Sequence, residues 1–89
     1  MLFSELKTAL SQMNKNIVRG MDILQMEKKK EELVSLKKEM EKPGFWETPE
    51  EARVISQKAS GLEKMIVRWE NLLGDGKALG EMLEMIEED

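Results

Sequence analysis

The chain has 89 residues, enough for one core, and its 36% charged, 40% hydrophobic and 4% aromatic residues are typical of long helices with solvated outer faces. Because it contains no Cys and no His, disulfides, thiolate metal sites and the commonest general base are excluded, and we expect no enzyme activity, metal or cofactor. The net charge of −4 is unevenly distributed: residues 1–42 contain nine basic and seven acidic residues, and residues 43–89 contain five basic and eleven acidic residues. The acidic second half excludes a general nucleic-acid surface there, and sequence-specific nucleic-acid binding is not expected.

The first predicted helix covers residues 3–19. Its large apolar side chains recur at spacings of three and four, which keeps them on one helix face as in a coiled coil. The row consists of Phe3, Leu6, Leu10, Met13 and Ile17. Gly20 follows Arg19, and a glycine after a basic residue is a common end of a helix. We therefore place a connector at residues 20–23.

The start of the chain is not typical of an export signal. It gains charge at Glu5 and Lys7, so it lacks the basic start and unbroken apolar stretch of a signal peptide. No apolar run approaches the roughly 20 residues that span a bilayer. These features favour a soluble, cytoplasmic protein with no membrane partner.

The second predicted helix covers residues 24–42. Lys29 falls on its inner row, where the aliphatic stem of a lysine can lie along apolar surface. The other members of that row are Met26, Leu33, Leu36 and Met40. The basic run Lys28, Lys29 and Lys30 is flanked by glutamates, which favours a solvated helix face over a surface for RNA phosphate or an acidic protein.

A turn at residues 43–47 is predicted between the second and third helices. Pro43 ends the second helix because it has no N–H and restricts the residue before it. Thr48 is expected to be the N-cap of the next helix, with Pro49 at its first position and Glu51 completing a capping box. Phe45 and Trp46 either fold back over the end of the helix pair, which we favour, or form an exposed anchor for a partner.

The third predicted helix covers residues 49–87. Gly74 and Gly76 would suggest a turn. The apolar spacing of three and four continues across them, however, which favours one helix, bent or weakened at these glycines, over two helices. The row is Leu62, Met65, Trp69, Leu72, position 76, Leu79, Leu83 and Ile86. The predicted fold class is all-α, an antiparallel bundle or coiled coil of three helices, with apolar surface left uncovered from Leu79 to Ile86.

Four segments occur in an order that identifies a family. They are Ile17–Gly20 at the end of the first helix, Lys28–Leu33 in the second, Glu39–Trp46 leading into the turn, and Pro49–Ala52 opening the third. This order resembles the N-terminal region of bacterial class I peptide chain release factors of type 2. The connector after Gly20 and the glycines at 74, 76 and 80 depart from the family pattern.

The resemblance implies a role in translation termination. Complete members read the stop codons UGA and UAA with a Ser-Pro-Phe motif and promote peptidyl-tRNA hydrolysis with a Gly-Gly-Gln motif, and this sequence contains neither. The chain would then be the first helical domain, which faces the base of the large-subunit stalk of the ribosome and is linked to the class II release factor GTPase. A fragment of this kind predicts that another helix of the domain is missing.

Two functional hypotheses remain. In the first, the chain contacts the ribosome, with Arg19, Lys28, Lys29 and Lys30 as the candidate contact residues and Pro43, Phe45, Trp46, Thr48 and Pro49 as a structural turn. In the second, it is a free-standing coiled coil that self-associates through Leu79, Leu83 and Ile86. Concentration-dependent association distinguishes them, because a stable oligomer favours the second.

Overall fold

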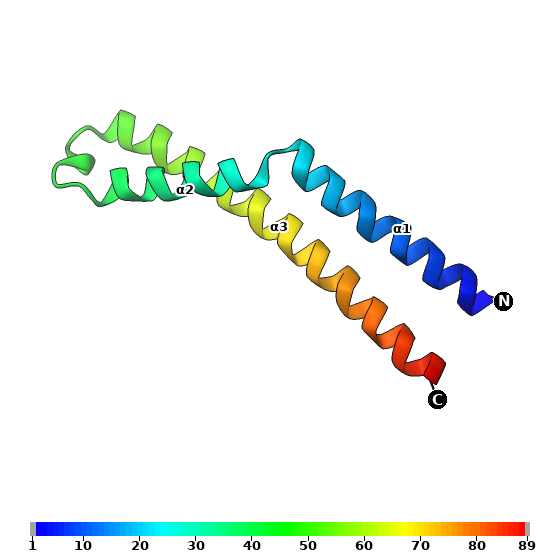
Figure 1. The fold of residues 1–89 in the computed structure, drawn as a ribbon. Coiled ribbons are helices and arrows are strands. Elements are labelled where there is room, and N and C mark those ends of the chain that lie inside the picture. The colour runs from blue at the N-terminus through cyan, green and yellow to red at the C-terminus, as the bar shows by residue number, and fades with distance from the viewer. Residues whose placement is uncertain (1, 89) are drawn as a thin grey trace. The chain divides into compact units, whose positions relative to one another are not determined.

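The computed structural model describes residues 2–88, with side chains through residue 86, and it is helical almost throughout (Figure 1). The elements are α1 (Leu2–Ile23), α2 (Met26–Glu41), the short 3-10 helix η1 (Phe45–Glu47) and α3 (Pro49–Glu88). No strand occurs in this part of the chain. The prediction of an all-α fold with three helices is therefore confirmed.

The chain divides into two compact units. The α1–α3 unit consists of residues 2–24 and 68–88, and the α2–α3 unit of residues 25–67. In the α1–α3 unit the helices run antiparallel, because Asn14 and Gly20 of α1 contact Gly76 and Trp69 of α3, so that residue numbers rise in one helix as they fall in the other.

The predicted end of the first helix at Arg19 is wrong. α1 continues through Gly20 to Ile23, and Gly20 has ordinary helical geometry. A Cβ atom at Gly20 would lie 2.8 Å from Cη2 of Trp69, a distance that real contacts do not show. This glycine therefore lets the two helices approach closely over the indole ring, and it does not end the helix.

The connector between α1 and α2 is only Leu24 and Gln25. Gln25 has φ 53° and ψ 55°, the left-handed conformation, and it is the only non-glycine residue with positive φ in the described chain. Its carbonyl still accepts the N–H of Lys29 at 3.1 Å, the first hydrogen bond of α2. One residue in an unfavourable conformation thus ends one helix and starts the next.

The α2–α3 unit packs α2 against the first half of α3 (Figure 1). Its buried residues are Met26 of α2, Ala52 and Ala59 on the early turns of α3, and Ile66 further along α3. Small residues at a helix contact allow the two backbones to approach, so the alanines set the spacing of this pair. Ion pairs Lys58–Glu32, at 3.0 Å, and Lys37–Glu63, at 3.5 Å, join the helices at the exposed edge.

The start of α3 agrees with the predicted N-terminus. The helix begins at Pro49, and the carbonyl of Thr48 accepts the N–H of Ala52 at 3.0 Å, as the N-cap residue does. The side-chain part of the predicted capping box is not formed, because within residues 2–88 neither the Thr48 hydroxyl nor the Glu51 carboxylate makes a hydrogen bond. The proline and the backbone therefore fix this boundary.

The third helix is continuous through Gly74 and Gly76, as predicted. The helix stays in phase here for a physical reason, since Gly76 is buried against α1 and leaves room for the side chain of Asn14. Gly74 has no heavy atom near the place of a Cβ and faces solvent.

The predicted apolar rows are wrong by one residue at several positions. Leu6 and Met13 of α1 are exposed, as are Leu72 and Leu79 of α3. At each of these four places the next residue in the sequence faces the opposite helix. The residues that face the opposite helix are then Phe3, Lys7, Leu10, Asn14 and Ile17 in α1 and Trp69, Leu73, Gly76, Gly80 and Leu83 in α3. The helices are rotated in this way because the glycines, which carry no side chain, lie in the contact.

Candidate functional site

The basic run of α2 does not form one patch. Consecutive residues of a helix lie 100° apart, so three lysines in a row spread over about 200° of its circumference. Lys28 is exposed, whereas Lys29 and Lys30 are half-buried, and Lys30 pairs with Glu27 at 3.6 Å. The expected burial of the Lys29 stem is consistent with this placement. Lys28 is thus the most accessible cation of the run.

Arg19 is an exposed residue of α1, four residues before the helix ends at Ile23. A cation near the C-terminus of a helix is favoured by the helix dipole. Arg19 belongs to the α1–α3 unit and the three lysines to the α2–α3 unit. The assignment of these four residues to a ribosome contact remains a prediction.

The aromatic turn places one ring inward and the other outward. Gly44 has φ 84° and leads into η1, where Phe45 and Trp46 meet edge to face at a centroid distance of 4.8 Å and an angle of 88°. Phe45 is half-buried beside a hollow that Pro43, Thr48 and Ile55 also line. Trp46 is 62% exposed, so the favoured prediction that both rings cover the end of the helix pair is wrong for Trp46.

The difference between the two rings follows from the local backbone. A 3-10 helix has three residues per turn, so neighbouring side chains point about 120° apart and cannot both face the helix pair. The second alternative, an exposed aromatic anchor, fits Trp46 better than the first. Sequence reasoning found both aromatics but could not assign their directions.

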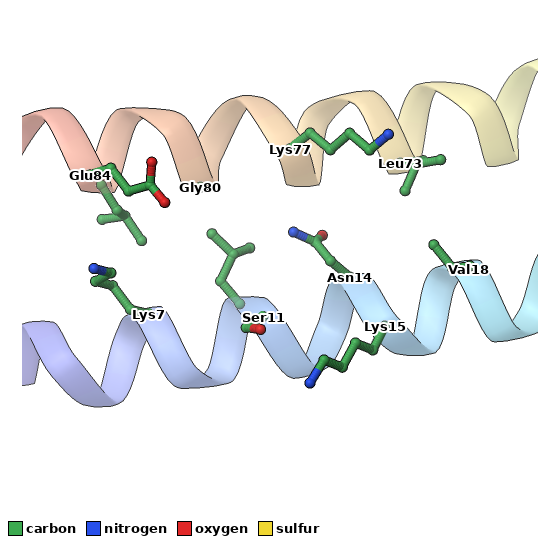
Figure 2. A pocket seen from close by; sticks show the side chains of 11 residues that line it. Lys7, Ser11, Asn14, Lys15, Val18, Leu73, Lys77, Gly80 and Glu84 are labelled. Atoms are coloured by element: carbon green, nitrogen blue, oxygen red, sulfur yellow. The ribbon is translucent and has the colours of Figure 1, made fainter.

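A groove of about 610 Å³ lies between the two helices of the α1–α3 unit (Figure 2). We call it the α1–α3 groove. Leu10, Val18, Leu73 and Leu83 supply apolar surface, and Lys7, Lys15, Lys77 and Glu84 supply charges. Of its lining, only Leu10 and Leu83 belong to the apolar rows predicted from the sequence, and the groove itself was not predicted.

Asn14 lies at the centre of the groove and points toward α3 (Figure 2). Its Nδ2 donates a hydrogen bond to the carbonyl of Gly76 at 3.1 Å, and a Cβ at Gly76 would overlap its Oδ1. That oxygen is buried and has no hydrogen-bond partner in the structure. A polar residue inside a helix contact costs stability but fixes the register of the two helices.

The opposite side of the α1–α3 unit is apolar and exposed. Lys15, Val18 and Lys77 line the groove, and each comes directly after a residue that faces the opposite helix. The residues directly before those that face the opposite helix lie on the other side of the antiparallel pair. We use the name rear face for the exposed apolar residues of this side, which are Leu2, Leu6, Met13, Leu72, Leu79, Met82 and Ile86; the exposed Arg68 and Asp75 lie on the same side of α3. The predicted uncovered surface near Leu79 and Ile86 is part of it, whereas Leu83 faces the groove.

The described residues contain no group of three or more Asp and Glu side chains that could hold a metal ion. None of the helices between residues 2 and 88 is long and apolar enough to cross a membrane.

A curated protein shares similarity with the entire chain. Over 89 residues the chain is 30% identical to peptide chain release factor 2 of Petrotoga mobilis, and the match covers 24% of that protein. The chain thus spans about a quarter of the length of this relative. No protein-family model and no solved structure matches the chain. The sequence is therefore similar to one part of a release factor.

Proposed function

We propose that the chain is the N-terminal helical domain of a class I peptide chain release factor of type 2 and acts in translation termination in the cytoplasm. The similarity to a release factor over all 89 residues is the observation that carries this proposal. The order of helix, short connector, helix, aromatic turn and long helix supports it. The chain itself has no catalytic role in this proposal.

In the complete factor, this domain would face the base of the large-subunit stalk and take part in the interaction with the class II release factor GTPase. Recognition of UGA and UAA and hydrolysis of peptidyl-tRNA would belong to the rest of that protein. The accessible cations Lys28 and Arg19 are the first candidates for contacts with the ribosome. Lys29 and Lys30 would contribute less because they are half-buried.

A chimaera tests the proposal. The chain replaces the matching quarter of the Petrotoga mobilis factor, and peptide release is measured on ribosomes programmed with UGA, UAA or UAG. We expect release at UGA and UAA by the chimaera and none by the 89-residue chain alone. Release by the isolated chain, or an inactive chimaera that still folds, would contradict the proposal.

The contact residues are tested in the same chimaera by ribosome binding. The quadruple variant with Arg19, Lys28, Lys29 and Lys30 changed to Ala should raise Kd about tenfold, equivalent to about 1.4 kcal/mol. A control variant that removes the same number of charges elsewhere changes Lys38, Arg53, Lys58 and Lys64 to Ala. Equal effects of the two variants would remove the contact assignment.

The second candidate function is self-association, which the rear face favours. Contiguous exposed apolar surface of this kind is uncommon on a monomer. A second copy of the chain could cover Leu79 and Ile86, whereas Leu83 would not take part because it lines the groove.

A further inference from the structure

The residues of α3 that face its partner helices follow one strict repeat. Two sets of positions, each spaced by seven residues, are buried or half-buried, and of the other residues of α3 through Ile86 only Ser56 and Met65 are not exposed. The two sets are Ala52, Ala59, Ile66, Leu73 and Gly80, and Ile55, Leu62, Trp69, Gly76 and Leu83. A seven-residue repeat forms one stripe along a helix. α3 therefore offers a single stripe, and we call it the α3 stripe.

The rows of α1 and α2 that face α3 are each regular but are out of phase with one another. Both rows follow spacings of three and four, and Ile17 and Met26 are the one buried residue of each helix. These two residues are nine positions apart, so an unbroken helix would make about two and a half turns between them and place them on opposite sides. The rows are Phe3, Lys7, Leu10, Asn14, Ile17, Met21 and Leu24 in α1, and Met26, Lys29, Leu33, Leu36 and Met40 in α2. One continuous helix could not present both rows to the α3 stripe.

The composition of the connector does not explain why the helix is interrupted there. Leu24, Gln25, Met26 and Glu27 are all good helix formers, and none is a glycine, a proline or an asparagine. Gln25 nevertheless has a φ of 53°, which is unfavourable for a residue with a side chain. When the backbone opposes the local preference, contacts elsewhere in the fold maintain it. The contacts that need the interruption are those of the two rows with the α3 stripe.

We propose that the connector of Leu24 and Gln25 sets the phase between α1 and α2. Its left-handed residue makes up the half turn by which the two rows disagree, so that both rows meet the α3 stripe. If Gln25 only ended the first helix, the number of residues between Ile17 and Met26 would be unimportant. That number is therefore the quantity to test.

The test uses deletion variants of the whole 89-residue chain. Deleting both Leu24 and Gln25 leaves Ile17 and Met26 seven positions apart, about two turns, so that they lie on the same side of a helix. Because Leu10 and Asn14 contact Gly80 and Gly76, an unbroken continuation of α1 brings the position of Leu24 opposite Ile66, and the deletion moves Met26 into that position. We expect α1 and α2 to fuse into one helix, with a midpoint of thermal unfolding at least as high as that of the unmodified chain.

Each single deletion should do more damage than the double deletion. Deleting Gln25 alone, or Leu24 alone, leaves a spacing of eight and turns the two rows about 80° apart, which should lower the unfolding midpoint by roughly 10 °C or more. The matched control deletes two exposed residues within α2, Lys37 and Lys38, and should also lower the midpoint, because it breaks the spacing inside a row. Circular dichroism at a concentration where the chain sediments as a monomer measures all four variants.

Tryptophan fluorescence provides a second measurement at the contact of α1 with α3. With Trp46→Phe in every variant, Trp69 is the remaining tryptophan, and its ring lies against Gly20. Its emission should stay unchanged in the double deletion and move to longer wavelength in the single deletions. The proposal is wrong if the double deletion unfolds no higher than the single ones, or if a single deletion keeps both the midpoint and the emission of the unmodified chain.

Discussion

Two glycines of the α1–α3 unit stand where a side chain would meet the opposite helix. At Gly20 the neighbour is the ring of Trp69, and at Gly76 it is the amide of Asn14. Gly61 and Gly74, by contrast, have no heavy atom within 4 Å of a built Cβ. The same residue type therefore has opposite effects on stability at different places in these helices.

We expect Gly20→Ala to lower the free energy of unfolding by up to about 2 kcal/mol, since overpacking costs about 1–3 kcal/mol and the better helix propensity of alanine returns about 1 kcal/mol. Gly74→Ala should raise it by about 1 kcal/mol, because only the propensity changes. Urea denaturation followed by circular dichroism measures both. A stabilising effect at both sites would show that Trp69 does not restrict Gly20.

Single residues were predictable where their chemistry acts locally. Pro49 marks the start of α3 because a proline fits the first turn of a helix, and this depends on no distant contact. The direction of Trp46 and the role of Gly20 depend on what lies across the fold. The sequence near Gly20 suggests a helix end, and only the position of Trp69 shows why the glycine is helical.

At the scale of elements, the connector of α1 and α2 is under strain at Gln25. Left-handed backbone costs an L-residue with a side chain about 1–2 kcal/mol, whereas glycine adopts it freely. The two helices follow each other with only Leu24 and Gln25 between them, and of these Gln25 has a positive φ of 53°. The conformation is a requirement of the short connector.

Gln25→Gly should therefore raise the free energy of unfolding by about 0.5–1 kcal/mol, the relief of strain minus the larger chain entropy of glycine in the unfolded state. Gln25→Ala is the control, because alanine has the same difficulty with positive φ and should bring no such gain. Thermal unfolding of the three proteins gives the comparison. Equal stabilities of the glycine and alanine variants would mean that the strain is absent in solution.

The positions that face the opposite helix could not be fixed from the apolar spacing of α1. The rows Leu6, Leu10, Met13 and Phe3, Lys7, Leu10 both follow spacings of three and four, and hydrophobicity favours the first. In the structure the second row faces α3, because Asn14 fits beside Gly76 and this contact sets the rotation of the neighbouring turns of α1. The presence of helices is a local property, whereas their rotation is a property of the pair.

On the scale of the whole molecule, the rear face gathers seven exposed apolar side chains of the α1–α3 unit. They lie along both helices of that unit. A molecule with such a surface tends to associate at high concentration. If the chain is a domain of a longer protein, association of the isolated chain should be weak.

Sedimentation equilibrium over a wide concentration range tests this expectation. The unmodified chain should associate reversibly, and Leu6→Lys with Leu79→Lys should weaken association at least tenfold, or about 1.4 kcal/mol, because both residues are about half exposed. Val34→Lys with Val54→Lys, on exposed valines of the other unit, should leave it unchanged. A tight oligomer would favour the free-standing coiled coil, and a monomer at every concentration would refute both expectations.

The contact of Asn14 with Gly76 also limits how the sequence can drift. Any substitution at position 76 brings a side chain into the space of the Asn14 amide. A larger residue at position 14 would collide with the backbone of α3 at Gly76. The two positions, 62 residues apart, are therefore expected to change together. Related chains that keep this helix pairing should show a small residue at one position whenever the other is large, and a substitution at either position alone should be rare among them.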